Sequence, residues 1–423
     1  MITPTDHQMQ GIEAALSDME TNDVGVIDGY AGTGKTSIVE WLLENRWQNR
    51  EVLMLGPTWL SVKVAVQRTR LQGKSIHGAI SGRAFMDEDG KLQFGGWNAD
   101  KLPYKGIVWL DEASMVGEYL GERLKEQLYR AQCKLFVTKD PFQLPPVKAK
   151  SFFSPEDTSF TFTEIHRQSA GIGIQALTAM RNGDITSYSS LKNYLAANSD
   201  QTSLGTEMKA VGTMSDRIWK RFIDAYGDGN EGQIIVHRNK TRIALNTKIR
   251  FHKGFMQKGP LVVGEKLIAT NNTGNFINGD TFIVADFEPY TGSYFEAIER
   301  LSPTNLGLTK VTAEDGRSCV ISLAALEKTW AKIVGPVNKA IRKIKGKQQR
   351  FLSKLLRELV NVDYCYTMTA HKAQGSQWPN VLYVWEKSVN ALREPDSPLA
   401  FLRHPYTGMS RYQQNCFIAY GDN

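Results

Sequence analysis

Residues 29–37 read Gly-Tyr-Ala-Gly-Thr-Gly-Lys-Thr-Ser, and this stretch decides the fold of the first part of the chain. Two glycines separated by four residues, followed by Lys35 and Thr36, form the pattern of a phosphate-binding loop. In such a loop backbone N–H groups surround a triphosphate, the lysine reaches the β- and γ-phosphates, and the threonine hydroxyl holds Mg²⁺. The apolar residues 24–28 predict a strand before the loop, and residues 37–44 predict a helix after it. We therefore expect a nucleotide-binding domain rather than an ordinary glycine-rich turn.

The composition is that of a globular protein with a basic bias. The 423 residues are 41% hydrophobic and 22% charged, and a chain of this length predicts about two to four domains. The formal net charge of +7 favours a polyanionic partner. The bias is concentrated in residues 332–357, which contain nine Lys or Arg and no Asp or Glu. This segment could contact a nucleic-acid backbone, or it could be an amphipathic helix with a solvated cationic face.

Cysteine usage and hydropathy predict an intracellular location. Cys133, Cys319, Cys365 and Cys416 lie far apart and form no pair with metal-ligand spacing. The polar N-terminus lacks the apolar core of a signal peptide, and no apolar run approaches the length of a membrane span. We expect a cytoplasmic protein without a membrane segment.

The first half of the chain alternates strand-like and helix-like patterns. Apolar segments follow the loop strand near residues 51–58, 106–110, 134–138 and 161–167, which predicts an α/β fold with a parallel, doubly wound sheet over residues 1–185. The working residues of such a sheet lie at the carboxyl ends of its strands.

An insertion interrupts this first domain. Residues 80–105 contain two short strand patterns around an Asp-Gly turn, which predicts a β-hairpin.

The second half predicts a further α/β domain that is split by an insertion. The polar, weakly patterned residues 186–231 predict a linker, and α/β patterns occupy residues 232–258 and 361–423. The intervening residues 259–360 predict a small β-barrel, centred on 259–325, followed by the basic helical segment.

Acidic and amide side chains follow the predicted strands of the first domain. Asp111 and Glu112 come directly after an apolar strand, where the first can hold Mg²⁺ beside the loop threonine and the second can polarise an attacking water. Gln143 lies in a turn after the next strand and could sense a γ-phosphate. Arg167 and Arg411 lie near strand ends, and arginine is the residue that stabilises charge on a transferring phosphoryl group.

These motifs together resemble those of superfamily 1 DNA helicases of the RecD-like, Dda-like branch, in the right order from Gln8 to Arg411. The most specific segment is Thr-Ala-His-Lys-Ala-Gln-Gly-Ser at residues 369–376, which that family uses to couple DNA contact to the nucleotide. The resemblance implies two RecA-like domains with Mg-ATP in their cleft, a barrel insertion of the Src-homology-3 type, and 5′→3′ movement on single-stranded DNA.

The resemblance also assigns site residues. Catalytic roles fall on Lys35, Asp111, Glu112, Gln143, Arg167 and Arg411. Metal binding falls on Thr36 and Asp111. ATP contacts fall on the adenine-reading Gln8 and on Gly29, Ala31, Gly32, Thr33, Gly34, Lys35, Thr36, Ser37, Gln374 and Gly375. DNA contacts fall on Pro57, Thr58, His77, Thr369, His371 and Lys372.

Two positions depart from the family pattern, and one aromatic residue suggests a further role. Lys139 stands where the family usually has glycine, and Met409-Ser410 replace the usual aliphatic residue and threonine. Phe94 lies in the predicted hairpin, where an aromatic ring could stack on the last base pair and separate the strands, or could anchor the hairpin to its domain.

The leading interpretation is an ATP-driven DNA helicase that acts as a monomer on single-stranded DNA and on single/double-strand junctions. Replication and single-strand-binding proteins are candidate partners, and the compact size would suit a viral accessory helicase in a host cytoplasm. A nucleotide-gated nucleic-acid clamp without unwinding activity shares the binding motifs. A small-molecule kinase explains only the phosphate-binding loop. An RNA substrate stays open, because no residue selects for or against a 2′-hydroxyl.

Overall fold

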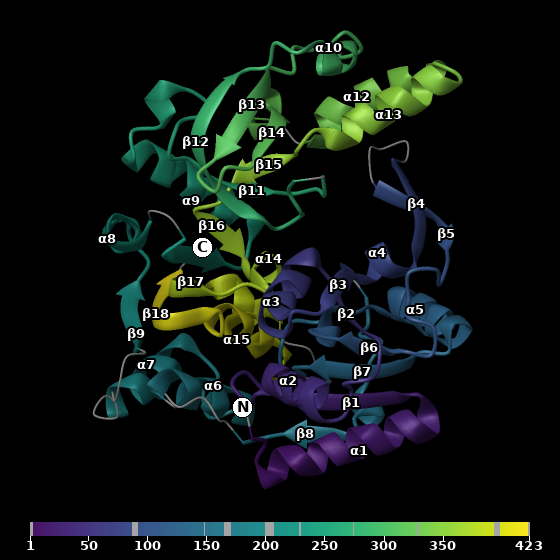
Figure 1. The fold of residues 1–423 in the computed structure, drawn as a ribbon. Coiled ribbons are helices and arrows are strands. Elements are labelled where there is room, and N and C mark those ends of the chain that lie inside the picture. Colours follow the sequence, from purple (N-terminus) through teal and green to yellow (C-terminus); the bar gives the residue numbers. More distant parts are fainter. Residues whose placement is uncertain are drawn as a thin grey trace.

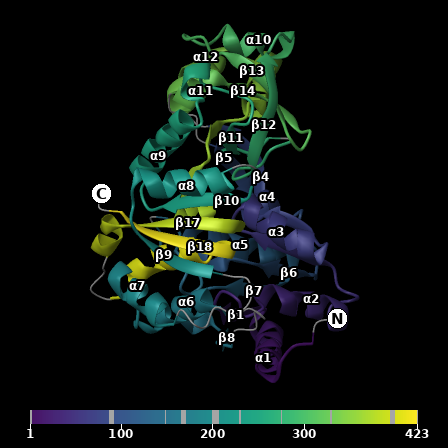
Figure 2. The same ribbon diagram turned by 90° about the vertical axis from the view of Figure 1, so that its left-hand side faces the viewer.

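The computed structural model describes residues 3–86, 92–147, 149–164, 171–198, 207–227, 230–273, 275–327, 330–392 and 398–421. In this part of the chain the strands form two parallel sheets, an antiparallel sheet and a separate hairpin (Figure 1). The first parallel sheet lies at one end of the molecule, the antiparallel sheet lies at the other end, and the second parallel sheet lies beside the first (Figures 1 and 2).

The first parallel sheet has the strand order β3-β2-β6-β7-β1-β8. Its strands are β1 (Val24–Gly29), β2 (Val52–Gly56), β3 (Gln72–Ser75), β6 (Ile107–Leu110), β7 (Lys134–Lys139) and β8 (Phe160–Phe162). Its helices are α1 (Asp6–Asn22), α2 (Lys35–Asn45), α3 (Trp59–Thr69), α4 (Ile76–Ile80) and α5 (Glu118–Ala131). The predicted doubly wound α/β fold is therefore present.

The phosphate-binding loop joins a buried strand to a helix, as predicted. Five of the six residues of β1 are buried, because β7 and β8 flank the strand and α1 covers it. Helix α1 begins with Thr5 and Gln8, which form a reciprocal capping box that satisfies the first backbone donors of the helix. The loop is thus held between well-packed elements at the carboxyl end of the sheet.

The predicted hairpin consists of β4 (Ser81–Met86) and β5 (Leu92–Trp97). The strands pair antiparallel with Ala84 opposite Phe94. The hairpin follows α4 directly, and in Figure 1 it extends from the first sheet toward the end of the molecule that carries the antiparallel sheet.

The second parallel sheet has the strand order β16-β10-β17-β18-β9. Its strands are β9 (Glu207–Thr213), β10 (Gly232–Val236), β16 (Thr367–Thr369), β17 (Trp378–Glu386) and β18 (Tyr412–Gly421). The helices around it are α6 (Ile172–Asn182), α7 (Tyr188–Ala197), α8 (Asp216–Tyr226), α9 (Asn239–His252), α14 (Ala370–Ala373) and α15 (Arg403–Met409).

The domain boundary and the linker predicted between the two sheets are wrong. Helix α6 was expected to end the first domain, but its buried residues pack in one core with Ile235 and Tyr383 of the second sheet. The segment 186–231, expected to be a linker, contains β9, which pairs with β18 as the edge strand of the second sheet. An edge strand has a neighbour on one side only, so β9 does not need the continuous apolar run that marks a central strand.

The antiparallel sheet has the strand order β14-β13-β12-β11-β15. Its strands are β11 (Lys266–Ala269), β12 (Thr281–Pro289), β13 (Leu308–Ala313), β14 (Ser318–Ser322) and β15 (Val362–Tyr364). A single parallel bridge joins Ile321 of β14 to Val360, two residues before β15, so the two outer edges of the sheet approach each other where the small barrel was expected.

One segment of the predicted second α/β domain is divided between two sheets. The second part of this domain was expected to begin at residue 361. Instead β15 pairs with β11 in the barrel, and β16 pairs with β10 in the parallel sheet. The chain therefore leaves the antiparallel sheet at Cys365 and enters the second parallel sheet two residues later, at Thr367.

The basic segment forms a helical hairpin rather than one helix. Helix α12 (Trp330–Lys343) and helix α13 (Lys347–Glu358) are joined at Gly346, which has a φ of 78°. Their apolar faces pack with α10 (Ser293–Glu299) beside the barrel. The remaining short helices are α11 (Leu323–Glu327), η1 (Ala113–Met115), η2 (Pro155–Asp157), η4 (Met256–Lys258), η5 (Lys387–Leu392) and η6 (Ala400–Leu402). Within the described ranges, no helix combines the length and the apolar character that crossing a membrane requires.

Candidate functional site

A cavity of about 680 Å³ lies at the carboxyl end of β1, between the two parallel sheets. Most of its lining comes from the first sheet, and the residues from the second are Gln377, Ser410 and Arg411. The predicted residues that it brings together are Gln8, Ala31, Gly32, Gly34, Lys35, Thr36, Ser37, Asp111, Glu112, Gln143 and Arg411.

The phosphate-binding loop is shaped by two left-handed glycines. Gly32 and Gly34 have φ values of 90° and 84°, a conformation that glycine adopts without a steric cost. Lys35 Nζ donates to the carbonyl oxygens of Gly29 (2.5 Å) and Tyr30 (3.2 Å), so the ammonium group lies across the loop. These donors and this cation at the start of α2 are suited to a phosphate chain.

Gln8 connects the first helix to the loop. Its Nε2 donates to the Thr33 carbonyl (3.0 Å), and its Oε1 accepts from the Thr5 backbone N–H (3.1 Å). The side chain is buried and lies close enough to Gly34 that a Cβ there would approach Gln8 Nε2 to 2.7 Å. The amide assigned to adenine recognition therefore also fixes the position of the loop.

Two carboxylates follow β6 and lie in different environments. Asp111 Oδ1 accepts from Thr138 Oγ1 (2.7 Å) and from the Glu112 backbone N–H (2.9 Å), which fixes its orientation. Glu112 has a φ of 52°, a left-handed conformation that is uncommon outside glycine and that points to a functional constraint. Burial raises the pKa of Glu112, and the nearby Arg411 guanidinium opposes that rise. A carboxylate with a raised pKa is suited to accepting a proton from water.

Gln143 and Arg411 face the same cavity from opposite sheets. Gln143 is 5% exposed, and its Oε1 has no hydrogen-bond partner among the described residues. Arg411 is 4% exposed, and its guanidinium is positioned by the Thr407 carbonyl (3.1 Å from Nε) and by Ser410 Oγ (2.9 Å from Nη2). Arg411 Nη1 lies 3.9 Å from Glu112 Oε1, across the boundary between the sheets.

The residues assigned to Mg²⁺ suit that ion chemically. Thr36 and Asp111 both line the cavity, and their hydroxyl and carboxylate oxygens are the hard ligands that Mg²⁺ prefers. Mg²⁺ usually takes few protein ligands and completes its coordination with phosphate oxygens and water. The donor set therefore fits a metal bound together with a nucleotide.

The second sheet holds the first through the segment that follows β7. The Tyr406 hydroxyl donates to Asp140 Oδ2 (2.9 Å) and accepts from the Ala31 backbone N–H (3.1 Å). Leu144 is bound at both backbone groups, because its N–H donates to Thr407 Oγ1 (3.0 Å) and its carbonyl accepts from Gln374 Nε2 (3.1 Å). The segment that carries Gln143 is thus fixed directly to α14 and α15.

Lys139, which departs from the family pattern, forms a buried ion pair under the loop. Lys139 Nζ lies 3.2 Å from Asp28 Oδ1, and both side chains are almost fully buried. The two residues are direct neighbours in the parallel register of β1 and β7. Burial raises the pKa of Asp28, and Lys139 opposes that rise. The departure from glycine thus comes with a compensating acid on the adjacent strand.

Residues assigned to DNA lie where the two sheets meet on another side. Thr58 caps α3, because its Oγ1 accepts from the Ser61 backbone N–H (3.2 Å). A Cβ on Gly375 would lie 3.1 Å from the Ser61 backbone nitrogen, so the segment that contains Thr369 and His371 comes next to the start of α3. One predicted DNA-contacting segment of each sheet thus meets at Ser61 and Gly375, and we call this meeting line the seam.

Three residues assigned to DNA are partly desolvated. Burial lowers the pKa of His77 and of His371, so both imidazoles are neutral over a wider pH range than usual. Burial also lowers the pKa of Lys372. A neutral imidazole can both donate and accept a hydrogen bond, so it can contact a DNA strand without adding charge.

Some predicted residues are not brought to the cavity. Gln374 and Gly375 do not line it, since the Gln374 amide binds the Leu144 carbonyl instead. Gly29 and Thr33 belong to the loop but do not line the cavity either. Arg167 lies outside the described residues, and the side chain of Phe94 is likewise not described.

Sequence reasoning missed six residues of the cavity wall. Tyr30 lies inside the loop motif and Gln377 directly follows the segment 369–376, so motif position could have indicated both. Arg68 on α3 reaches the cavity because Glu40 holds its guanidinium at 3.1 Å, a contact that only the packing of α2 and α3 creates. The full set of missed residues is Thr3, Thr5, Tyr30, Arg68, Gln377 and Ser410.

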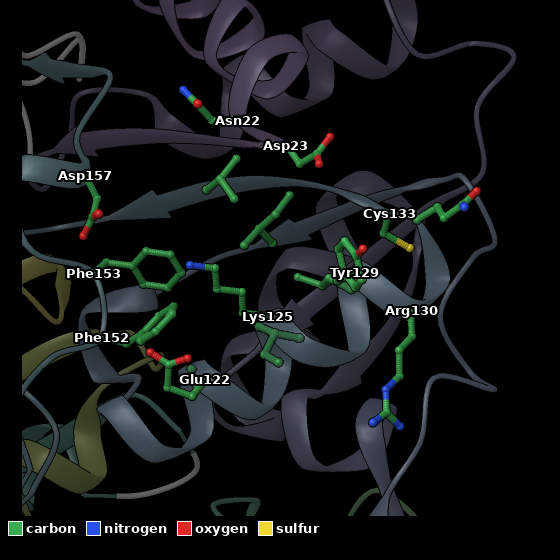
Figure 3. A pocket seen from close by; sticks show the side chains of 16 residues that line it. Asn22, Asp23, Glu122, Lys125, Tyr129, Arg130, Cys133, Phe152, Phe153 and Asp157 are labelled. Atoms are coloured by element: carbon green, nitrogen blue, oxygen red, sulfur yellow. The ribbon is translucent and has the colours of Figure 1, made fainter.

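A larger cavity of about 860 Å³ lies at the amino ends of β1 and β7, between α5 and the segment around Phe152 (Figure 3). Figure 3 shows Phe153 and Lys125 on its wall, with Asp23 and Cys133 further along. Neither the phosphate-binding loop nor Asp111 contributes to it. We assign the candidate site to the smaller cavity, because that one contains the phosphate-binding residues.

Comparison with known proteins agrees with this arrangement. Residues 4–200 match the family model of the AAA domain. No curated protein matches the chain. A crystal structure of Pif1 helicase from Bacteroides in complex with ADP-AlF3 and ssDNA matches over 99% of this chain and 92% of its own, with 17% identity and a TM-score of 0.55.

A crystal structure of Pif1 helicase from Candida albicans matches over 99% of this chain and 94% of its own, with 16% identity and a TM-score of 0.54. At these identities the matches concern the fold. The two parallel sheets therefore correspond to two RecA-like domains. Residues 4–200 match the AAA domain, and the whole chain has the fold of the Pif1 helicases.

Proposed function

We propose that this protein is an ATP-dependent DNA helicase that moves 5′→3′ on single-stranded DNA and separates duplex DNA. The observation that carries the proposal is the meeting of Arg411 and Glu112 at 3.9 Å beside the phosphate-binding loop, although they belong to different sheets. A nucleotide that binds there contacts both RecA-like domains, so its hydrolysis changes the contact between them.

The ATP site assigns a role to each group. Lys35 binds the β- and γ-phosphates, and backbone N–H groups of residues 31–37 hold the phosphate chain. Thr36 and Asp111 hold Mg²⁺, which supplies charge neutralisation at the phosphate oxygens when it is bound. Glu112 accepts a proton from the attacking water, and Gln143 orients that water or senses the γ-phosphate. Arg411, together with Arg167, stabilises the charge that develops on the γ-phosphoryl group.

Two features of the structure support these roles. The unpaired Oε1 of Gln143 is buried against the cavity and lacks the hydrogen bond that a buried amide normally has. A nucleotide-bound water would supply that bond. The raised pKa of Glu112 also favours a carboxylate that gains a proton during the reaction.

Coupling to DNA follows from the contacts between the sheets. We place the tracking strand along the seam where Ser61 approaches Gly375, with Thr58 of the first RecA-like domain and Thr369, His371 and Lys372 of the second as its proposed contacts. The bonds from Gln374 and Thr407 to Leu144 connect this seam to the Gln143 segment. We further propose that Phe94 separates the strands at the junction. The matched Bacteroides Pif1 structure that contains ssDNA supports a DNA partner.

Unwinding of paired substrates tests the proposal. We expect ATP-dependent strand displacement on a duplex with a 5′ single-stranded tail and little displacement on the same duplex with a 3′ tail. Displacement of only the 3′-tailed substrate would reverse the direction. ATP hydrolysis stimulated by DNA without any displacement would favour the nucleotide-gated clamp instead.

A variant in the loop tests the ATP site. We expect Lys35→Ala to abolish DNA-stimulated ATP hydrolysis, because the lysine contacts the phosphates. Lys125→Ala, an exposed lysine on α5 in the same domain, serves as the control and keeps wild-type hydrolysis. Full hydrolysis by Lys35→Ala would falsify the assignment.

A further inference from the structure

Two exposed aromatic rings lie beside the basic surface of the α12–α13 hairpin, one on α13 and one on the adjacent α10. Phe351 on α13 is 48% exposed, and Tyr294 on the adjacent α10 is 40% exposed. Their ring centroids are 6.0 Å apart and the rings are perpendicular. Large exposed aromatic side chains that touch each other on a helix surface point to a binding function.

Phe351 is not needed for the core of the hairpin. Leu352, Leu355 and Leu356 form the buried face of α13 and satisfy its packing against the barrel side. Phe351 lies at the exposed margin of this buried face, next to Lys347 and Lys354, which are four residues before it and three after it. The helix therefore presents an aromatic ring between two cations.

Tyr294 is held in place beside this face. Its hydroxyl donates to Glu358 Oε2 (2.8 Å), and Glu358 Oε1 lies 3.7 Å from Lys354 Nζ. The fixed Tyr294 supports the Phe351 ring at its edge. The two rings form a rigid platform, which lowers the entropy cost of binding a flat ligand.

The charge of the surrounding surface selects a polyanion. Residues 332–357 contain nine Lys or Arg and no acid, and the exposed ones within α13 include Lys347, Arg350 and Lys354. Glu358 follows this stretch and pairs with Lys354, so Lys347 and Arg350 provide the excess positive charge next to Phe351. Aromatic rings that alternate with cations are typical of surfaces that bind single-stranded nucleic acid, because each base offers a face for stacking and each phosphate a charge. Bases in a duplex are already stacked on one another and do not offer their faces.

The platform lies away from the seam that we assign to the tracking strand. In Figures 1 and 2, α12 lies beyond the barrel strands, at the end of the molecule opposite α1. The seam lies between α3 and α14, at the level of the two parallel sheets. The tracking strand therefore does not explain the platform, and the other single strand at a junction is the complementary one.

We propose that Phe351 and Tyr294, with Lys347, Arg350 and Lys354, bind the strand that is displaced from the duplex. This inference rests on the proposed helicase function. Holding the displaced strand on the barrel keeps it from pairing again behind the junction while the tracking strand passes between the RecA-like domains.

Equilibrium binding of junction substrates tests this inference. Fluorescence anisotropy of the full-length protein is compared on a 5′-tailed duplex and on the same duplex with an added oligothymidine tail on the complementary strand. We expect the second tail to tighten binding about fivefold or more, as expected for one stacked base. Phe351→Ala and, independently, Lys347→Glu should each remove that gain.

The same anisotropy measurement on two variants of α5 provides the control. Lys125 and Tyr129 on α5 are exposed and have the spacing of Lys347 and Phe351, so Tyr129→Ala and Lys125→Glu should keep the full gain. The inference is overturned if the second tail adds nothing in the wild type, or if Phe351→Ala keeps the gain. It is also overturned if a tail of abasic sites tightens binding as much as thymidine, since phosphate contact alone would then suffice. ATP hydrolysis stimulated by oligothymidine is measured separately on the wild type, and its absence would reject the helicase assignment rather than this site.

Discussion

The hydroxyl group of Tyr406 donates a hydrogen bond to Asp140 Oδ2 at 2.9 Å, across the boundary between the two RecA-like domains. The same oxygen accepts the Ala31 backbone N–H of the phosphate-binding loop. One side chain of α15 thus contacts both the loop and the segment that carries Gln143. Both Tyr406 and Asp140 are fully buried, so water cannot replace the bond.

Removing this hydroxyl should weaken communication between the domains. We expect Tyr406→Phe to lower the DNA-stimulated kcat for ATP about tenfold and to cost about 1–3 kcal/mol of stability, because Asp140 loses its buried partner while the ring keeps its packing against Phe142. Steady-state ATPase kinetics and thermal melting measure the two effects. Tyr129→Phe, on an exposed ring, is the control. Wild-type kinetics in Tyr406→Phe would show that the bond plays no part in coupling.

The acidic limb of the pH profile should report Glu112. Burial raises the pKa of this carboxyl group, so it takes up a proton at a higher pH than an ordinary glutamate does. A base works only when it is deprotonated, so kcat should fall as the pH decreases through this raised pKa. Arg411 favours the charged form, and its removal should therefore move the limb to still higher pH.

The comparison of Arg411→Ala with Arg411→Lys tests this assignment. Both variants lose phosphoryl stabilisation, and we expect kcat of Arg411→Ala to fall by about 10³-fold. The retained charge in Arg411→Lys should keep the acidic limb nearer to its wild-type position. The position of the acidic limb is measured from pH–kcat profiles, each normalised to its maximum. If the limb lies at the same pH in both variants, the charge at position 411 does not influence the pKa of Glu112.

An ion pair should hold the first RecA-like domain against the barrel. Lys63 Nζ on α3 lies 3.1 Å from Asp280 Oδ1, and Arg317 binds Asp280 Oδ2 at 2.8 Å. Because Lys63 is about half exposed, we expect Lys63→Ala to cost less than about 1 kcal/mol of stability. It should nevertheless broaden the distance distribution between spin labels on α3 and on the barrel.

Lys248→Ala provides a matched control for this pair. Lys248 binds Asp216 at the same 3.1 Å, but both residues belong to the second α/β unit. Its removal should leave the distance between α3 and the barrel unchanged. An unchanged distribution in Lys63→Ala would mean that the contact of Leu60 with Gly279 alone fixes the barrel.

The strand-separating role of Phe94 can be isolated from ATP hydrolysis. We expect Phe94→Ala to lower the unwinding rate of a 5′-tailed duplex about tenfold or more while it keeps the ATPase rate on single-stranded DNA, because stacking on the terminal base pair is lost. Phe251→Ala, on an exposed ring of α9, should change neither rate. Normal unwinding by Phe94→Ala would assign the residue to the structure of the hairpin.

Local patterns predicted much of the fold. The individual strands of the first parallel sheet, of the hairpin and of the antiparallel sheet each follow from patterns of residues close together in the chain. The pairing of β9 with β18 depends on residues about two hundred positions apart and leaves a weak local pattern on an edge strand. The division of residues 362–369 between two sheets failed for a related reason, since a strand pattern does not state which neighbour it pairs with.

In the candidate site, too, the residues that belong to local motifs were predicted, whereas the contacts between segments far apart in the chain were not. The motifs predicted most residues of the nucleotide cavity, because the residues that bind phosphate follow strand ends. The roles of Tyr406, Thr407 and Leu144 were not predicted, since their hydrogen bonds join segments more than 260 residues apart. A motif records which residues are present, but these contacts arise only when the two sheets come together.

The buried pair of Lys139 and Asp28 restricts the paths by which this sequence can change. Loss of either charge alone would leave the other buried and uncompensated next to the loop, at a cost of roughly 3–5 kcal/mol. A chimera that takes β1 from one relative and β7 from another would meet the same penalty if only one parent carries the pair. Positions 28 and 139 are therefore expected to change together, because either single change leaves one buried charge without its partner.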